Sequence, residues 1–346
     1  MSFACCMMIG SGLLAGCHQT PSPKASHNRP VFTHDILLKT TPVKDQGKSS
    51  LCWVYAMLAT LETEHLMQGD SVNLSADFVA RAFLREQIME NSFISSSSHA
   101  ALPYTTRGTL PMLLQLIRTY GLTHEDAYHL REKSNYHILC RRLSQMSQVA
   151  GSRRHTMEEA DSLLDEYLRP VPRHVFMNGA EYTALEFAHS VCRRDEYDVA
   201  TSFSHHPFFQ RFPLEIPDNR YHSTFLNLPI DTLMNRINQS LLAGHPVCWE
   251  GDVSEKGFSF RQGIARLRDE NHVVTQQERQ QLFEQGKTTD DHCMAIVGMA
   301  HDAKGIRYYV MKNSWGTKNV YGGFLYMSEN YLRQKTIAVA IRNRND

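Results

Sequence analysis

The chain has 346 residues, of which 42% are hydrophobic and 21% charged, a balance typical of a globular protein with one large domain or two closely packed ones. Its 36 lysines and arginines equal its 36 aspartates and glutamates, so no overall charge favours nucleic acid or anionic lipid. No sequence repeat of fixed period is present.

The chain begins with an apolar segment, "MSFACCMMIGSGLLAGC". The segment is too short to span a bilayer, which takes about 20 residues, but it has the length of a signal-peptide core. It ends in "LLAGC", which resembles the bacterial lipobox. We therefore predict a lipoprotein signal peptide at 1–16, although it lacks lysine and arginine, and a lipid on Cys17. The alternative is an apolar N-terminal helix packed on the domain.

A polar stretch with several prolines follows Cys17 and predicts a tether over residues 17–37. The folded domain is then expected at 38–346. These features predict a protein anchored by lipid in the bacterial cell envelope, facing the periplasm or the outer surface. A cytoplasmic location is the alternative if the first segment is not a signal.

Residues 52–67, "CWVYAMLATLETEHLM", predict a helix with one buried face, because apolar side chains stand at positions 54, 57, 58 and 61. Ser49 and Ser50 precede the helix and are candidates for its N-terminal cap. Cys52 falls in the first turn, where the positive end of the helix dipole favours a thiolate.

The later elements change in character along the chain. Helices that end at a glycine are predicted at 110–121 and 229–246, with a mostly helical stretch at 130–200 and a long ordered loop region at 203–229. Four strands are predicted after residue 290, in "HCMAIVGMA", "IRYYVMKNS", "GGFLYMS" and "TIAVAI". A helical first part and a β-rich last part predict an α+β protein with segregated parts.

Residues far apart in the sequence can form a site around Cys52. His292 begins one predicted strand and Asn313 ends the next, so the two can lie side by side. A protonated histidine lowers the pKa of a neighbouring thiol, and a third group fixes the histidine's tautomer. The backbone N–H of Cys52 and the side-chain amide of Gln46 are candidate donors to an oxyanion.

These segments resemble the active site of papain-like cysteine peptidases. "QGKSSLCW" is similar to the Gln-x5-Cys-Trp segment of that family, and "DHCMAIVG" and "YYVMKNSWG" are similar to its His and Asn segments, in the same order. Cys52 and His292 are 240 residues apart, against about 130–150 in papain itself. The stretches "SFSHHPFFQRF", "FLNLPIDTL" and "LLAGHPVCWEGDVSEKGF" narrow the resemblance to the bleomycin hydrolase and bacterial aminopeptidase C branch.

The resemblance spans roughly residues 38 to 342. It implies a papain-like two-lobed fold, with a helical N-terminal lobe, an antiparallel β C-terminal lobe and a helical insertion at about 130–230. It also implies that the substrate is a peptide or protein and that no cofactor is needed.

The resemblance implies a role for each matching residue. Cys52 resembles the nucleophile that forms the thioacyl-enzyme, and His292 the base that deprotonates it and later protonates the leaving amine. Asn313 resembles the residue that orients His292, Trp315 the ring that shields their hydrogen bond, and Gln46 the oxyanion donor.

A substrate-binding segment is implied by "TTRGTLPMLLQLIRTYG". Gly108 matches the second of two glycines whose backbone pairs with the substrate chain. Arg107 stands where the family has the first glycine, so a narrower or charged subsite is expected.

The end of the chain departs from the branch. Bleomycin hydrolase-like enzymes carry a C-terminal arm whose carboxylate meets the substrate amine and imposes aminopeptidase action. Here "RNRND" follows the last predicted strand, too short to reach back at about 3.3 Å per residue. We therefore expect endopeptidase action or a looser exopeptidase, and the oligomeric state stays open.

Other side chains are expected to be structural. The five cysteines after Cys17 have no C-x-x-C spacing, so neither a zinc site nor a disulfide framework is predicted. Cys293 is expected in the core, on the opposite strand face from His292. His205 and His206 are expected to point apart, so no metal site is predicted there.

Two other functions stay open. One is a catalytically silent binding protein on the same fold, and the other is a thiol acyl or peptidyl transferase. Retention of Cys52, His292, Asn313 and Gln46 favours the peptidase over the silent protein.

Overall fold

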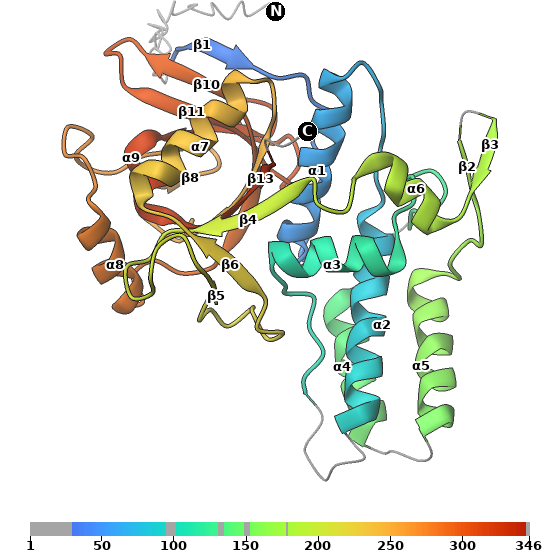
Figure 1. Ribbon diagram of the computed structural model, residues 1–346. Helices are drawn as coiled ribbons and strands as arrows, with labels where there is room; N and C mark the ends of the chain where they lie inside the picture. Colours follow the sequence, from blue (N-terminus) through green and yellow to red (C-terminus); the bar gives the residue numbers. More distant parts are fainter. Residues whose placement is uncertain (1–29, 95–101, 131–134, 149–152, 178, 344–346) are drawn as a thin grey trace, which may run out of the picture. The chain divides into compact units, whose positions relative to one another are not determined.

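A computed structural model describes residues 30–94, 102–130, 135–148, 153–177 and 179–343 (Figure 1). The chain divides into Met1–Pro30 and Val31–Asp346. The predicted signal peptide, the lipidation site Cys17 and the end of the tail at Asp346 lie outside the described residues. Within the described ranges, every helix falls short of the length or apolar character needed to cross a membrane.

The helices of the first part agree with the predicted ones where apolar residues recur with a clear helical period. They are α1 (Cys52–Met67), α2 (Ala76–Ile94), α3 (Leu110–Tyr120), α4 (Tyr136–Gln148), α5 (Arg153–Leu168) and α6 (Ala184–Val191). The predictions at 52–67 and 110–121 are confirmed to within a residue. Helix α3 has a proline in its first turn and ends at Gly121, whose φ of 85° suits a residue without Cβ.

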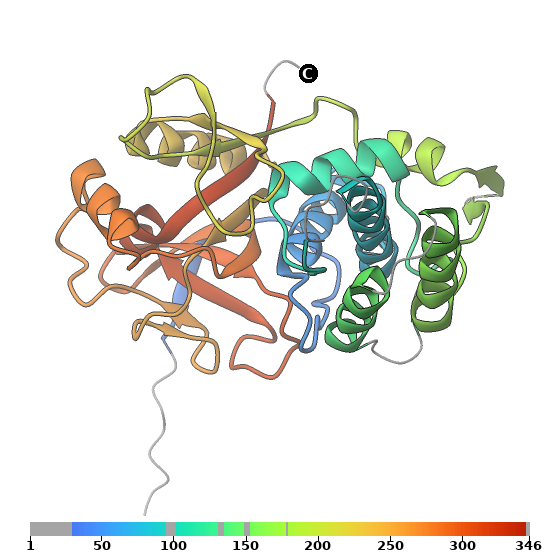
Figure 2. The same cartoon turned by 90° about the horizontal axis from the view of Figure 1, so that it is seen from below.

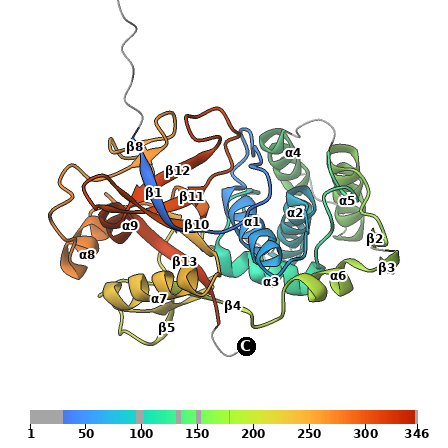
Figure 3. The ribbon, with the colours of Figure 1, turned by 90° about the horizontal axis from the view of Figure 1, so that it is seen from above.

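Helix α1 is buried on nearly all sides, so the prediction of a single buried face is wrong. Figures 2 and 3 show α1 between the strands on one side and the other helices on the other. Even Thr60, Glu62 and Glu64 are buried. A helix with tertiary partners all round loses its amphipathic pattern, because each face meets a core.

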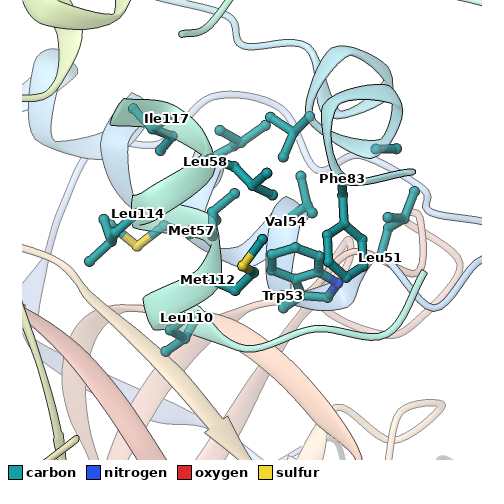
Figure 4. Packing of buried hydrophobic residues seen from close by; sticks show 14 of the residues in the cluster. Leu51, Trp53, Val54, Met57, Leu58, Phe83, Leu110, Met112, Leu114 and Ile117 are labelled. Carbon is teal, nitrogen blue, oxygen red and sulfur yellow. The ribbon is translucent and has the colours of Figure 1, made fainter. Parts of the chain in front are cut away.

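The helical core forms around Trp53, the residue after Cys52 (Figure 4). Its ring packs edge-on against Phe83 of α2, with ring centroids 5.1 Å apart, and its Nε1 donates to the carbonyl of Thr106 over 2.9 Å. Leu110 and Met112 of α3 are buried in the same cluster. This packing fixes the first turn of α1 against two other helices.

The second part is a sheet of 11 strands among the described residues. The order is β5-β6-β4-β13-β7-β10-β11-β12-β9-β8, and β1 pairs with β10. The strands are β1 (Phe32–Leu37), β4 (Tyr197–Thr201), β5 (Arg211–Pro213), β6 (Thr224–Asn227), β7 (Val247–Gly251), β8 (Phe258–Ser259), β9 (Ile264–Ala265), β10 (His292–Asp302), β11 (Arg307–Lys312), β12 (Phe324–Ser328) and β13 (Thr336–Arg342).

The four strands predicted after residue 290 are confirmed as β10 to β13. The predicted antiparallel C-terminal lobe is confirmed for most pairs of β10 to β13, but two further pairs are parallel, β4 with β6 and β9 with β12. The long connections before β6 and β12 allow these parallel pairings, which no hairpin can make.

The predicted tether is too long at its C-terminal end. Residues 32–37 form β1, which pairs antiparallel with the far part of β10, where Phe32 lies opposite Asp302. The ring of Phe32 stacks on Tyr326 with centroids 3.9 Å apart. An exposed edge strand with polar side chains resembles a tether in composition, and only its ladder partner distinguishes the two.

The predicted insertion at 130–230 contributes strands as well as helices. A separate hairpin is formed by β2 (Val175–Met177) and β3 (Ala180–Tyr182), whereas β4, β5 and β6 join the main sheet. The helix predicted at 229–246 is confirmed as α7 (Ile230–Leu242). The short helices α8 (Gln276–Glu284) and α9 (Glu329–Lys335) were not predicted.

Candidate active site

Cys52 is the first residue of α1 and is half-buried. Leu51 occupies the cap position and no side chain caps the helix, so the predicted serine cap is wrong. Ser49 instead donates its hydroxyl to the carbonyl of Gln46 over 2.7 Å. Because the first N–H groups of α1 are free of a side-chain cap, they stay available to a charge near the sulfur.

The pKa of Cys52 is held well below its usual value. The main cause is a hydrogen bond from the Cys293 thiol, followed by the hydrogen bond and charge of His292, and burial opposes both. Cys293 is buried in the core, as predicted, and its contact with Cys52 was not predicted. His292 is the first residue of β10, so both neighbours reach a sulfur at that end of the strand.

His292 and Asn313 are joined by a hydrogen bond, and their predicted adjacency is confirmed. The distance from His292 Nε2 to Asn313 Oδ1 is 2.7 Å, because Asn313 directly follows β11, the neighbour of β10. Ser314 donates its backbone N–H to the same oxygen, also over 2.7 Å, which fixes the orientation of the amide. Nε2 must then carry the ring proton, so Nδ1 is the nitrogen left for Cys52.

Trp315 covers His292, with ring centroids 4.4 Å apart. Two phenylalanines, Phe258 and Phe260, contact the indole ring edge-on, with centroids 5.9 and 5.3 Å from it. Neither phenylalanine was predicted from the sequence. The predicted shielding of the His292–Asn313 hydrogen bond by Trp315 stays a prediction, which the contact between the indole and the imidazole favours.

Gln46 is tied to the segment that follows Asn313. Its backbone N–H donates to the Ser314 carbonyl over 2.8 Å, and its Oε1 accepts from the Ser314 hydroxyl over 2.6 Å. Its Nε2 donates one hydrogen to the carbonyl of Ser49 over 2.7 Å. An amide nitrogen has two hydrogens, so one remains for an oxyanion. Gly47 makes the turn with a φ of 63°.

Gly108 lies against the indole of Trp53. A Cβ at this position would stand 2.7 Å from the ring, so packing alone requires glycine here. The neighbouring Arg107 binds both carboxylate oxygens of Asp218 through Nε, at 2.7 and 3.0 Å, and the Asp290 carbonyl through Nη2 at 3.1 Å. The charge expected at Arg107 is therefore present, but the guanidinium is paired with Asp218 and also contacts Asp290.

Three carboxyl groups near Cys52 were not predicted from the sequence, namely those of Asp218, Glu250 and Asp290. Burial raises the pKa of Asp218 and of Glu250, the latter well above its usual value, and raises that of Asp290 to about 7. The charge of Cys52 raises all three further. A glutamate inside the apolar strand "VCWEG" was the available signal.

His205 and His206 converge on Glu215, so the prediction that they point apart is wrong. Their Nε2 atoms lie 3.0 and 2.7 Å from the two carboxylate oxygens. The three groups have the spacing of a metal site. However, Gln280 donates to Nδ1 of His205, which places that ring's proton on Nε2, facing Glu215. Hydrogen bonds from the histidines to Glu215 explain the arrangement without a metal.

The chain is similar to several known proteins. Residues 175–345 match the Peptidase C1-like family. Aminopeptidase W of Lactobacillus delbrueckii subsp. lactis is 22% identical, with 97% of this chain and 87% of the relative covered. Aminopeptidase G of the same organism is 23% identical, with 89% and 82% covered.

A crystal structure of PepW from Lactobacillus rhamnosis superposes with a TM-score of 0.73 at 20% identity. The superposition covers 90% of this chain and 82% of that chain. Similarity at this level shows a common fold, and the predicted α+β class is confirmed.

Proposed function

We propose, from the premise that this chain is a papain-like cysteine peptidase of the bleomycin hydrolase branch, that it hydrolyses peptide bonds through a thioacyl-enzyme on Cys52. The observation that carries the proposal is a helix-start thiol of lowered pKa beside a histidine hydrogen-bonded to an asparagine. A thiolate is the nucleophilic form of cysteine, and an oriented imidazole supplies the proton that the leaving group needs.

The reaction proceeds in two halves. The Cys52 thiolate attacks the scissile carbonyl, and His292 gives a proton to the leaving amine from Nδ1. Water then attacks the thioester, with His292 taking the proton of that water. Asn313 holds His292 through Nε2 in both halves, which keeps Nδ1 directed at the sulfur.

The oxyanion of each tetrahedral intermediate is stabilised by the backbone N–H of Cys52 and the second amide hydrogen of Gln46. The hydrogen bonds from Gln46 to Ser314 and Ser49 hold this amide before the substrate arrives. A donor held in place costs no reorganisation during the reaction.

A thiol-directed epoxide tests this function against its alternatives. We expect one equivalent of label on Cys52, no label in Cys52→Ala, and hydrolysis of unmodified peptides. A folded protein that takes no label would establish the silent binding protein. Labelling with transfer of the acyl group to an amine acceptor, in place of water, would establish the transferase.

Two relatives are named aminopeptidases, which favours removal of N-terminal residues over cleavage within a chain. One peptide offered with a free and with an acetylated amine separates the two. Loss of all cleavage on acetylation would exclude the endopeptidase.

We also propose that Cys17 carries a lipid that anchors the enzyme in the bacterial envelope, with the cytoplasm as the alternative. The apolar segment before Cys17 supports this proposal. Incorporation of labelled palmitate, lost in Cys17→Ala, is the expected result. A protein without label in the soluble fraction would exclude the anchor.

A further inference from the structure

The reacting thiol of Cys52 has a second thiol beside it. Cys52 is the first residue of α1, and Cys293 is the second residue of β10. Cys293 belongs to the hydrophobic cluster against which Cys52 packs, and the two sulfurs are joined by a hydrogen bond. Both residues are free thiols in this structure. Two thiols that contact each other can form a disulfide when an oxidant removes two electrons.

The fold directs Cys293 toward α1. The ladder of β7 with β10 places Cys248 and Cys293 on one face of the sheet. Helix α1 covers this face, because Thr60 hydrogen-bonds to Cys248 and Cys52 hydrogen-bonds to Cys293. Cys248 thus faces a part of the helix that lies about 12 Å from Cys52 along the helix axis. Cys293 is therefore the described thiol that meets the start of α1.

The two thiols differ in reactivity. The pKa of Cys52 is lowered, so this residue is the thiolate that reacts with an oxidant. Burial raises the pKa of Cys293 well above its usual value, and the hydrogen bond and charge of Cys52 raise it further. Cys52 is half-buried whereas Cys293 is 3% exposed, so a dissolved oxidant reaches Cys52 first. An exposed thiolate next to a second cysteine is the arrangement of a redox-sensitive pair.

We propose that a hydroperoxide oxidises Cys52 and Cys293 to a reversible disulfide, which inactivates the enzyme. The Cys52 thiolate first attacks one oxygen of the peroxide, the O–O bond breaks, and Cys52 becomes a sulfenic acid. The other oxygen leaves as water or an alcohol with a proton from His292. The sulfur of Cys293 then attacks the sulfur of Cys52, and the S–O bond breaks. The hydroxide released takes the proton of the Cys293 thiol and leaves as water.

The first step favours the second. Oxidation removes the negative charge of Cys52, which is one cause of the raised pKa of Cys293. The disulfide removes the nucleophile, and a dithiol reductant returns it. Without Cys293, the sulfenic acid is open to further oxidation to a sulfinic acid, which thiols do not reduce. The loss of activity rests on the proposed function, whereas formation of the bond does not.

Peroxide treatment of the full chain, followed by peptide mapping, tests the proposal. Reduced protein is exposed to hydrogen peroxide, the remaining thiols are alkylated, and the protein is digested without reduction. We expect one linked pair of peptides that contains Cys52 and Cys293. Peptide hydrolysis should fall as the yield of this pair rises, and dithiothreitol should restore it. A wild type in which Cys52 and Cys293 stay unlinked would overturn the proposal.

Two variants localise the effect, each compared with its own activity before peroxide. In Cys293→Ala, the sulfenic acid probe dimedone should label Cys52, and dithiothreitol should restore little activity after longer oxidation. Cys248→Ala, which removes a buried thiol on the same sheet face, is the matched control and should keep the linked pair and the full recovery. Equal recovery in the wild type and in Cys293→Ala would contradict the role of Cys293. If Cys293→Ala does not fold, the maps of the wild type and of Cys248→Ala decide the question.

The peptide map separates this inference from the proposed function, because the bond forms without turnover of a substrate. A disulfide between Cys52 and Cys293 in a protein that hydrolyses no peptide would uphold the thiol pair and reject the peptidase. Peptide hydrolysis by a protein whose oxidised form lacks this disulfide would reject the inference alone.

Discussion

Two glutamates, Glu62 of α1 and Glu250 of β7, are almost equally buried but have very different partners. Glu62 of α1 is 1% exposed and receives hydrogen bonds from Thr41, from Lys44 at 3.0 Å and from the backbone of Leu74 at 2.9 Å. Glu250 of β7 is 0% exposed and receives none from the described residues. Burial alone therefore does not determine the partners of a carboxyl group, because Glu62 is surrounded by donors whereas the polar neighbour of Glu250 is another carboxyl group, Asp290.

The largest effect on activity is expected for a substitution of His292, beside Cys52. His292→Ala should lower kcat/KM by roughly 10³-fold or more without loss of folded protein, because the proton transfer loses its carrier. Peptide hydrolysis and circular dichroism check this. His301→Ala, on the other end of β10 and paired with Asp35, is the control and should keep full activity. Equal losses in both variants would contradict the assignment of His292.

The contribution of Glu62 to the stability of the fold is tested by Glu62→Gln. We expect the variant to lose about 3 kcal/mol of stability in urea unfolding, because Lys44 and Thr41 lose a charged partner in the interior. The folded fraction should keep the wild-type kcat/KM. A stability equal to that of the wild type would remove the distinction drawn between Glu62 and Glu250.

The same substitution at Glu250 is expected to raise the free energy of unfolding, whereas at Glu62 it lowers it. The raised pKa of Glu250 means that the folded state holds a proton that the unfolded chain releases, so this residue destabilises the protein increasingly as pH rises above the usual glutamate value. Glu250→Gln should gain about 2 kcal/mol at pH 8 and less at pH 5. Urea unfolding at the two pH values measures this. A loss of stability at pH 8 would show that Glu250 has a structural role like that of Glu62.

The smallest effect concerns Cys293. Its thiol hydrogen bond is the main cause of the lowered pKa of Cys52, so Cys293→Ala should move the acid limb of the kcat/KM profile to higher pH. The His292–Asn313 hydrogen bond does not involve Cys293, so the maximum rate should change little. Cys248→Ala, a buried thiol on the facing strand, is the control. An acid limb that stays in place would assign the lowered pKa of Cys52 to His292 and the helix.

The parts of the candidate site that depend on local structure could be predicted from short sequence motifs. A cysteine at a helix start and a histidine at a strand start occupy positions set by their own segments, and these predictions agree with α1 and β10. The adjacency of His292 and Asn313 followed from two consecutive strands. Such features depend on neighbours in the chain.

The parts of the fold and of the site that were not predicted depend on contacts between segments far apart in the sequence. Arg107 and Asp218 are 111 residues apart, and Glu250 meets Asp290 only because β7 pairs with β10. The strand β1 likewise looks like a linker until β10 is placed beside it. Alternation along β10 predicted a buried Cys293 but not its contact with Cys52, because that contact joins two distant segments.

The pairing of β1 with β10 has a mechanical consequence. The ladder starts at Phe32 and Asp302, ten residues from His292 along the same strand, or about 33 Å. Tension applied through the chain before Phe32 would therefore enter the domain at the end of β10 farthest from the histidine. The hydrogen bonds between β1 and β10 would then break one after another, starting at Phe32. The distance between this end of β10 and Cys52 would keep the force away from Cys52 and His292.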